Sequence, residues 1–329
     1  MSQRVSESGF EQEVLGDGPR LTAEEAAAAA GVPVGRARRL WRTLGFPDRG
    51  DEAAYTEADV TALELFVSFF EDGLIDFDSA LNVARGIGLT MSRLADWEVG
   101  ALIQRAEEMY AARDAAGESP SSAVPPAVRL TQEYGDRFEE LLIYTWRRHL
   151  VAATGRMESA RAIEEAPGTT HLTVGFADIV GFTALSNEVS REKIGDLVEI
   201  FESRCGEVIA SRHGRLIKAI GDAVLFVNDD PLHAFETAEG IINVIGRDQR
   251  MPDVRVGLAT GSVVLRLGDV FGPPVNLASR LTQVARRNRI IVDQETADLL
   301  PEEQIESRRL PARPVRGFGV VEPVAVRRP

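Results

Sequence analysis

The sequence predicts an α+β protein in which an all-helical N-terminal half precedes a ferredoxin-like βαββαβ domain. Between Leu21 and about Ala112, and again over 128–165, apolar residues recur at helical spacing. From His171 onward, short strand-like runs alternate with amphipathic segments in the order strand, helix, strand, strand, helix, strand. A length of 329 residues also fits about two domains.

The bulk composition favours a cytoplasmic protein with small-molecule or protein partners. The formal net charge of −14 is unlike the basic footprint of nucleic-acid binders. The lone Cys205 cannot form an intramolecular disulfide, which favours a reducing compartment. The polar N-terminus lacks the apolar core of a signal peptide, and no run approaches about 18 apolar residues, so no integral membrane anchor is expected.

The chain is expected to divide into four segments. The first lacks apolar periodicity and is expected to be disordered, and a Pro-, Ser- and Gly-rich stretch closes the second. The segments are a disordered N-terminus over 1–20, a helical regulatory domain over 21–126, a linker helix over 127–166 and a catalytic domain over 167–329.

Local patterns place several elements within these segments. Thr22 and Glu25 have the spacing of a capping box at a helix start. Gly86 and Gly88 are expected to interrupt the helical pattern, with a further helix over 91–112. In the last segment, strands over 215–220 and 223–227 form a hairpin, and the helices are expected to cover one face of the sheet.

Two aspartates stand where strands are expected to end. Asp178 follows an apolar strand, and Asp222 lies in the hairpin turn, so the two carboxylates can converge. Mg²⁺ prefers such oxygen ligands. Gly181, Phe182 and Thr183 follow the first strand and offer backbone N–H groups to a phosphate. Taken singly, each aspartate is more often an ordinary turn residue.

Three motifs in order give a more specific indication. FADIVGFTALS, IKAIGDAVLF and DVFGPPVNLASRL, spread over 171–329, together resemble the catalytic domain of class III adenylyl and guanylyl cyclases. Diguanylate cyclases share the fold type, but their Gly-Gly-Asp/Glu-Glu-Phe turn is not matched by IGDAVLF. The resemblance implies conversion of ATP to cyclic AMP and pyrophosphate.

The resemblance also implies a role for each matching residue. Two Mg²⁺ (or Mn²⁺) ions per site would stabilise the attacking and leaving oxygens, and positive charge would stabilise the transition state. The implied residues are Asp178, Asp222 and the carbonyl of Ile179 for metal, Lys218 and Asp269 for adenine, Asn276 for ribose, Arg280 for the transition state and, as a looser match, Arg316 for the terminal phosphates.

Lysine usage supports one of these roles. Among 37 basic residues only Lys193 and Lys218 are lysines, so a lysine in this chain stands out. An ammonium group can donate to adenine N1, and the Asp269 carboxylate can accept from its amino group. Lys193 lies at a helix start and is expected to be solvated; a solvated surface lysine is also the alternative for Lys218.

The resemblance further implies a homodimer. In the family, the metal aspartates of one subunit face the adenine pair, the asparagine and the arginine of the other, so each site is shared. An intact set of these residues argues against a non-catalytic scaffold. A DNA-binding or non-catalytic regulator that uses the cyclase fold for dimerisation is the alternative function.

The N-terminal half allows several interpretations. Residues 21–63 resemble the helix–turn–helix of MerR-type regulators, although the acidic charge argues against DNA. The layout resembles soluble actinobacterial cyclases with a regulatory helical domain, which implies pH-dependent autoinhibition and, in some members, fatty-acid modulation. His149 in the linker is the preferred pH sensor, with a solvated histidine as the alternative. Phe66, Phe69 and Phe70 are expected in a core, with a lipid pocket as the alternative.

Overall fold

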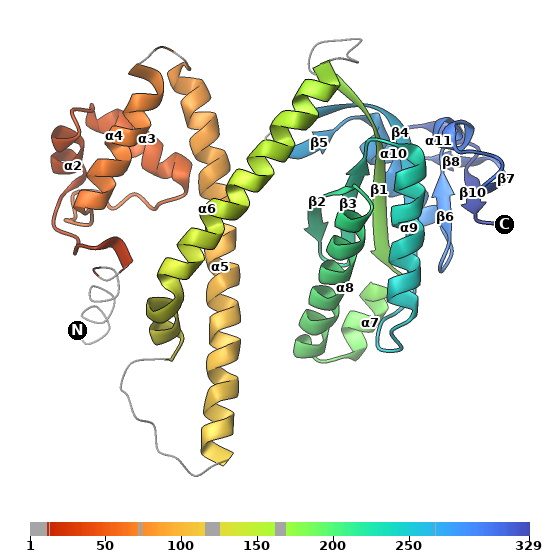
Figure 1. Ribbon diagram of the computed structural model, residues 1–329, viewed down its shortest axis with the longest axis horizontal. Coiled ribbons are helices and arrows are strands. Elements are labelled where there is room, and N and C mark those ends of the chain that lie inside the picture. The colour runs from red at the N-terminus through yellow and green to blue at the C-terminus, as the bar shows by residue number, and fades with distance from the viewer. Residues whose placement is uncertain are drawn as a thin grey trace. The chain divides into compact units, whose positions relative to one another are not determined.

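The computed structural model describes residues 12, 14–71, 73, 75–115, 126–161, 169–266 and 268–329. The chain forms two compact units, an N-terminal unit over Met1–Gly155 and a C-terminal unit over Arg156–Pro329 (Figure 1). Most of the segment expected to be disordered, residues 1–11 and 13, lies outside the described residues. No helix in the described ranges is long and apolar enough to cross a membrane.

The N-terminal unit is built from helices. They are α2 (Ala23–Ala29), α3 (Val34–Leu44), α4 (Glu57–Glu71), α5 (Phe77–Ala115) and the greater part of α6 (Pro126–Arg161). The predicted capping box at α2 is confirmed, because the Thr22 side chain accepts from the Glu25 N–H and the Glu25 carboxylate accepts from the Thr22 N–H.

An aromatic cluster fills the space between α4 and α5. The rings of Phe66, Phe70 and Phe77 meet edge to face, with centroids 5.6–6.1 Å apart. Phe66 is buried, and Phe70 and Phe77 are packed against the same core. Phe69 is exposed, so its predicted place in the core is wrong; it lies on the outer side of α4.

Helix α5 does not break at Gly86 and Gly88, so the predicted interruption is wrong. One helix runs from Phe77 to Ala115. A Cβ atom at residue 88 would lie 2.3 Å from the carbonyl oxygen of Leu44, whereas one at residue 86 would meet open space. Gly88 therefore allows the end of α3 to approach the α5 backbone closely, and the helix continues because helical glycine costs only about 1 kcal/mol.

This contact predicts opposite effects of two alanine substitutions. Gly88→Ala is expected to destabilise the N-terminal unit by about 1–3 kcal/mol, because the backbone of Leu44 must move. Gly86→Ala is the matched control and is expected to stabilise it by about 0.5–1 kcal/mol. Urea unfolding of the full chain, followed by far-ultraviolet circular dichroism, measures both. Equal effects of the two substitutions would contradict the close approach.

The C-terminal unit contains one eight-stranded sheet. β1 (Thr169–Ile179) is central and pairs antiparallel with β3 (Ala223–Asn228) and β4 (Val254–Arg266). β2 (Arg215–Ile220) lies beyond β3, so the order β2-β3-β1-β4 is the ferredoxin-like arrangement expected. The sheet continues through β6 (Ile290–Val292), β10 (Val324–Arg327) and β7 (Glu306–Arg309), with β5 (Asp269–Phe271) paired to β4.

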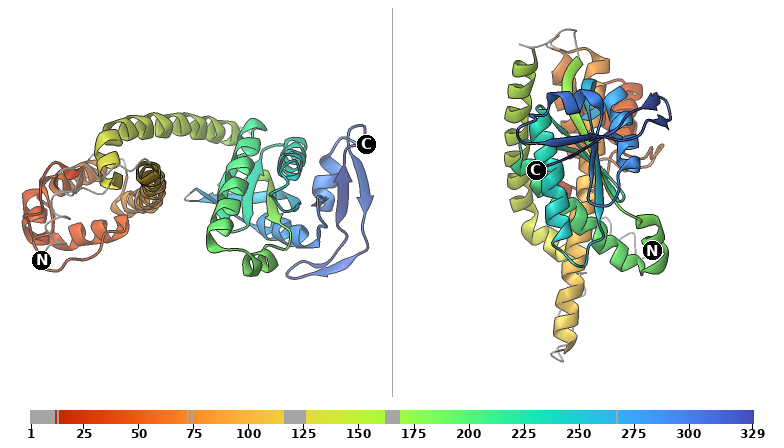
Figure 2. Two further views of the ribbon diagram at one scale, coloured as in Figure 1. Left: turned by 90° about the horizontal axis from the view of Figure 1, so that it is seen from below. Right: turned by 90° about the vertical axis from the view of Figure 1, so that its right-hand side faces the viewer.

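Helices cover both faces of this sheet, not one as predicted (Figures 1 and 2). α8 (Arg191–Ser211) and α9 (Pro231–Gly246) pack on the face that carries Ala177, Val224 and Val256. α10 (Pro273–Val284) packs on the opposite face, against Val174 and Leu225. The two ferredoxin-like helices do share a face; α10 is an additional element, and the approach of its backbone to Gly257 leaves no room for a side chain there.

The remaining elements complete the unit. Short helices α7 (Phe182–Glu188) and α11 (Gln294–Leu299) follow β1 and β6, and a separate hairpin of β8 (Arg313–Val315) and β9 (Gly319–Val321) lies near the C-terminus. The boundary between the two compact units falls inside α6, at 155/156. Of the predicted linker helix over 127–166, residues 162–168 lie outside the described residues.

Candidate active site

The two aspartates lie at neighbouring strand ends. Asp178 is the penultimate residue of β1, and its Cα pairs with that of Ala223, the residue after Asp222. The Ile179 N–H donates to the Asp222 carbonyl at 3.0 Å. Gly221 takes a φ of 61°, the left-handed region that this two-residue turn requires. The fold thus brings both carboxylates to one place.

Arg255 is the residue that sequence reasoning missed at this place. It stands opposite Asp178 in the β1–β4 register, and its Nε lies 2.7 Å from Asp178 Oδ2. Its Nη2 contacts the same oxygen at 2.5 Å. Burial raises the pKa of Asp178 above its ordinary value and the nearby Asp222 adds to the rise, whereas the Arg255 hydrogen bonds oppose it. Ionising both carboxyl groups is therefore unfavourable, and the positive charge of Arg255 offsets part of this unfavourable free energy.

These residues line a pocket together with the segment that follows β1. Gly181, Phe182 and Thr183, at the start of α7, are among its lining residues. Ser279, Thr282 and Gln283 of α10 also line it. We name this the acid pocket.

Lys218 and Asp269 meet from β2 and β5. The Lys218 Nζ atom lies 2.5 Å from Asp269 Oδ2, and the Val270 N–H donates to the other oxygen at 2.8 Å. Burial tends to raise the pKa of Asp269, but the hydrogen bonds from Lys218 and Val270 outweigh it and leave the pKa below its ordinary value. The register between β2 and β3 shifts between Leu216 and Lys218, a local irregularity of the kind that re-aims a side chain.

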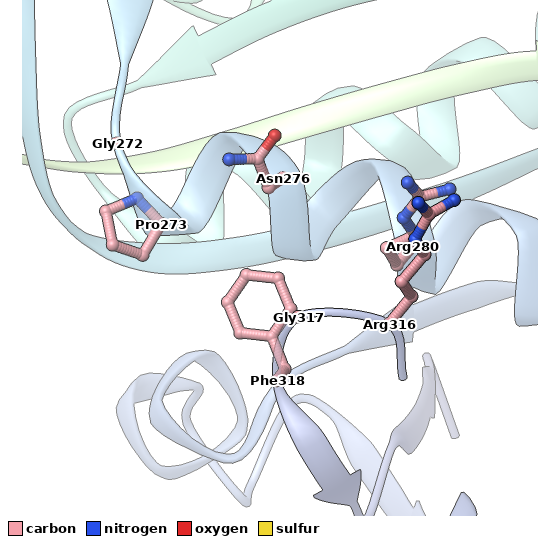
Figure 3. A pocket seen from close by; sticks show the side chains of 7 residues that line it. All are labelled: Gly272, Pro273, Asn276, Arg280, Arg316, Gly317 and Phe318. Carbon is pink, nitrogen blue, oxygen red and sulfur yellow. The ribbon is translucent and has the colours of Figure 1, made fainter. Parts of the chain in front are cut away.

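A second pocket lies beside α10 and is shown in Figure 3. Asn276 and Arg280, one helical turn apart on α10, line this pocket together with the turn that joins β8 and β9. Arg316 and Phe318 come from that turn, and the guanidinium ends of Arg280 and Arg316 lie beside each other. We name this the arginine pocket; Gly272, Pro273 and Gly317 complete its lining.

The arginine pocket is suited to an anion. Neither Arg280 nor Arg316 has a carboxylate partner within the described part of the chain; Arg280 makes only a 3.4 Å contact to the Gln283 side chain. Two adjacent guanidinium groups repel one another unless an anion lies between them. Phe318 was not predicted as a site residue. Its ring reaches the pocket because of the backbone conformation of the turn over Val315–Gly319, which the sequence motifs do not indicate.

The predicted site residues thus fall into three groups. The acid pocket holds Asp178 and Asp222, the arginine pocket holds Asn276, Arg280 and Arg316, and Lys218 with Asp269 lines neither. The two pockets adjoin along one face of α10, since Asn276 and Arg280 line one of them, Ser279 and Gln283 line the other, and the four positions share the i, i+3, i+4, i+7 face of the helix. His149, the predicted sensor, lies exposed on α6 in the N-terminal unit.

The sheet and these residue groups define a nucleotide cyclase of class III. The family model for the adenylate and guanylate cyclase catalytic domain matches residues 164–326. An adenylate cyclase of Streptomyces coelicolor is 39% identical over 94% of this chain and 86% of that protein. The chain therefore belongs to the adenylate and guanylate cyclase family, which confirms the predicted family, enzyme class and α+β fold class.

Two further relatives extend the similarity to the N-terminal half. An adenylate cyclase of Glutamicibacter nicotianae is 33% identical over 97% of this chain and 82% of that protein. A pH-sensitive adenylate cyclase of Mycobacterium tuberculosis is 30% identical over 86% of this chain and 71% of that protein. Both matches are longer than the cyclase domain, so the helical half belongs to the shared architecture.

Proposed function

We propose that this protein is an adenylate cyclase, which converts ATP to 3′,5′-cyclic AMP and pyrophosphate. The observation that carries the choice of base is the Lys218–Asp269 pair, whose charged groups lie 2.5 Å apart. Side by side, an ammonium donor and a carboxylate acceptor match N1 and the 6-amino group of adenine. Guanine presents a donor and an acceptor in the opposite order, so the same pair would oppose it.

The acid pocket has the donor set that suits Mg²⁺ or Mn²⁺. Asp178 and Asp222 supply carboxylate oxygens, and the Ile179 carbonyl is the further ligand that we propose. Mg²⁺ is commonly held by one or two carboxylates together with substrate phosphates. When bound, two such ions supply Lewis acidity to the attacking and leaving oxygens.

The chain's own residues would then orient and stabilise the substrate. Asn276 holds the ribose so that its 3′-oxygen attacks the α-phosphorus in line. Arg280, one turn along α10, faces the same space and stabilises the negative charge that develops on the phosphorus centre. Arg316 contacts the terminal phosphates, and Arg255 keeps Asp178 oriented through its two-atom contact.

We also propose that the active site is shared in a homodimer. The acid pocket contains neither Asn276 nor Arg280, and the arginine pocket contains no acid. A second copy that sets its arginine pocket against this acid pocket would complete both sites at once under two-fold symmetry. Exposed apolar side chains on β2, β4 and β5 provide surface for such a contact; they are Leu216, Ile220, Val264, Leu265 and Phe271.

The base-reading role predicts a change of substrate preference. Lys218→Glu combined with Asp269→Ser reverses the donor and acceptor order, so the ratio of kcat/KM for ATP to that for GTP is expected to fall by about 10²-fold or more. Steady-state assays with each nucleotide measure it. Lys193→Glu is the matched control, since Lys193 is exposed on α8, and should leave the ratio unchanged. An unaltered ratio in the double variant would exclude this pair from base recognition.

Regulation by the N-terminal unit is the second part of the proposal. We infer that pH regulates cyclase activity through this unit and that His149 takes part. Binding of a lipid in the helical core and a cytoplasmic location stay predictions. We expect the acid pocket to have a pH dependence of its own: metal binding needs the Asp178 carboxylate, whose pKa burial raises, so activity should fall as pH falls through that pKa. Cyclic AMP formation from pH 5.5 to 8 by the full chain, by residues 156–329 and by His149→Gln separates the two contributions.

The outcomes of this experiment are distinct. A pH step that is present in the full chain and lost in the other two proteins would support His149 as sensor. Identical pH profiles in all three proteins would leave the acid pocket as the source of the pH dependence and would exclude a role for the N-terminal unit. No cyclic nucleotide from any of them, with Mg²⁺ or Mn²⁺ supplied, would contradict the enzyme itself.

The DNA-binding alternative gains no support from α3, the second helix of the predicted helix–turn–helix. Three of its four arginines contact other groups of the N-terminal unit. Arg39 pairs with Asp78 at 3.2 Å, and Arg36 and Arg39 both lie over the Phe77 ring, 5.3 and 5.4 Å from its centre. Arg38 contacts Asp51 at 3.5 Å. Phosphates would have to compete with these contacts for three of the four charges on the helix.

A further inference from the structure

We propose that Gln283 is a positioning residue for the cyclase reaction, which holds the guanidinium group of Arg280 in the orientation that the transition state requires. The inference rests on the proposed function, because it applies only if Arg280 stabilises the charge that develops on the phosphorus centre. Gln283 acts through Arg280 and not by contact with the reacting atoms.

Arg280 needs an orienting contact because a like charge lies next to it. Its guanidinium group lies beside that of Arg316, and the two positive charges repel one another (Figure 3). Arginine is also long and flexible, so an unguided side chain loses much conformational freedom when it binds an anion. In the part of the chain that the structure describes, Gln283 provides the orienting contact: Arg280 Nη1 donates to Gln283 Oε1 at 3.4 Å.

The last turn of α10 gives Gln283 a firmly held backbone. The neighbouring Thr282 is buried, and its Oγ1 donates to the Phe176 carbonyl of β1 at 3.3 Å. A Cβ atom at residue 257 would lie 2.3 Å from the Thr282 nitrogen, so the backbone of this turn lies directly against β4. The Gln283 carbonyl also accepts from Arg255 Nη1 at 3.4 Å. A side chain on such a backbone can fix the orientation of a neighbour one helical turn away.

An amide suits this task better than a carboxylate. Its carbonyl oxygen accepts a hydrogen bond and leaves the whole positive charge of Arg280 for the substrate. A carboxylate at the same position would bind Arg280 more strongly but would offset that charge. Although the chain has 51 acidic residues, α10 contains none. The helix thus orients Arg280 without neutralising it.

Gln283→Met tests the proposal in the full chain, because it removes the acceptor and keeps the length of the side chain. If Arg280 acts in the transition state, kcat is expected to fall about five- to tenfold, with KM for ATP changed by less than about twofold. Gln283→Glu is expected to lower kcat further, because its carboxylate offsets the charge of Arg280. Gln294→Met and Gln294→Glu are the matched controls and should retain the wild-type kcat, since Gln294 donates to Asp298 on α11 and lines neither pocket.

Mixed dimers show which pocket Gln283 serves. When Asp178→Ala chains are combined with Arg280→Ala chains, the one complete site takes Arg280 from the first chain and Asp178 from the second. Gln283→Met is then added to one chain or to the other. The recovered activity is expected to fall at least about threefold more when Gln283→Met accompanies Asp178→Ala, because only there does it adjoin the Arg280 that works.

Three results would overturn the proposal. An unchanged kcat in Gln283→Met would show that the contact with Arg280 has no part in the reaction. A change confined to KM would show that it serves substrate binding and not the transition state. Equal losses in the two mixed dimers would mean that Gln283 acts through the acid pocket or through the packing of α10, since a structural defect affects both arrangements alike.

These results can be separated from a failure of the proposed function. Absence of cyclic nucleotide formation by the wild-type chain would remove the reaction itself. Wild-type activity without recovery in the mixture of Asp178→Ala with Arg280→Ala would remove the shared site. The kcat of Gln283→Met relative to that of Gln294→Met would then still decide the role of Gln283.

Discussion

Asp178→Asn is expected to abolish cyclic AMP formation, with a loss of about 10³-fold or more in kcat, while the fold and the dimer persist. The amide keeps the shape of the side chain but removes the charge that a divalent cation requires. The fold should tolerate the change, because burial and Asp222 already disfavour the charged form of Asp178. Product formation with Mg²⁺ and with Mn²⁺, together with sedimentation, measures both properties.

The control for this variant is an aspartate with a similar ion pair elsewhere in the C-terminal unit. Asp248 pairs with Arg204 at 2.7 Å and with Arg250 at 2.8 Å, away from both pockets. Asp248→Asn should therefore retain activity. If Asp178→Asn also retained it, the acid pocket would not be the metal site. Weaker Mn²⁺ binding by Asp178→Asn, measured by titration, provides a readout that does not depend on turnover.

Mixing two inactive variants is expected to restore activity. Asp178→Ala chains lack one of the two proposed metal-binding carboxylates of the acid pocket. Arg280→Ala chains lack the guanidinium group proposed to stabilise the transition state. A heterodimer of the two retains one complete site, since one chain supplies Asp178 and the other Arg280. With random pairing, half of the dimers are heterodimers with one of two sites intact, so about a quarter of the wild-type activity should return.

The mixing experiment has its own control. Asp178→Ala mixed with Asp222→Ala should restore nothing, because both substitutions damage the same pocket and every site stays incomplete. Subunit exchange must be shown separately, with differently tagged chains. Recovery in the control mixture, or none in the test mixture despite exchange, would contradict sites shared between chains.

Local patterns in the sequence predicted much of the fold. The hairpin around Gly221 and Asp222 follows from turn chemistry, and the capping box of α2 from two residues three apart. The convergence of Asp178 and Asp222 could be anticipated because both end strands. The hairpin and the capping box depend on residues that are near one another along the chain, whereas Asp178 and Asp222 converge through the pairing of β1 with β3.

Three features that depend on contacts between distant segments were not predicted. Arg255 contacts Asp178 only because of the β1–β4 register, 77 residues apart in sequence. Gly88 continues a helix because the backbone of Leu44 lies against it. The placement of α10 on the second face of the sheet likewise follows from tertiary packing, which periodicity within one segment does not encode.

The position of α10 has a consequence for how this protein can change over evolutionary time. The exposed face of this twelve-residue helix carries Asn276 and Arg280 beside Ser279 and Gln283, which line the two pockets, and the buried Ala278 and Leu281 hold the opposite face to the sheet. Most substitutions on α10 would therefore alter either a pocket or the packing of the helix on the sheet. Among divergent descendants of a common ancestor, α10 should therefore accept fewer substitutions per residue than α8, whose outer side faces only solvent.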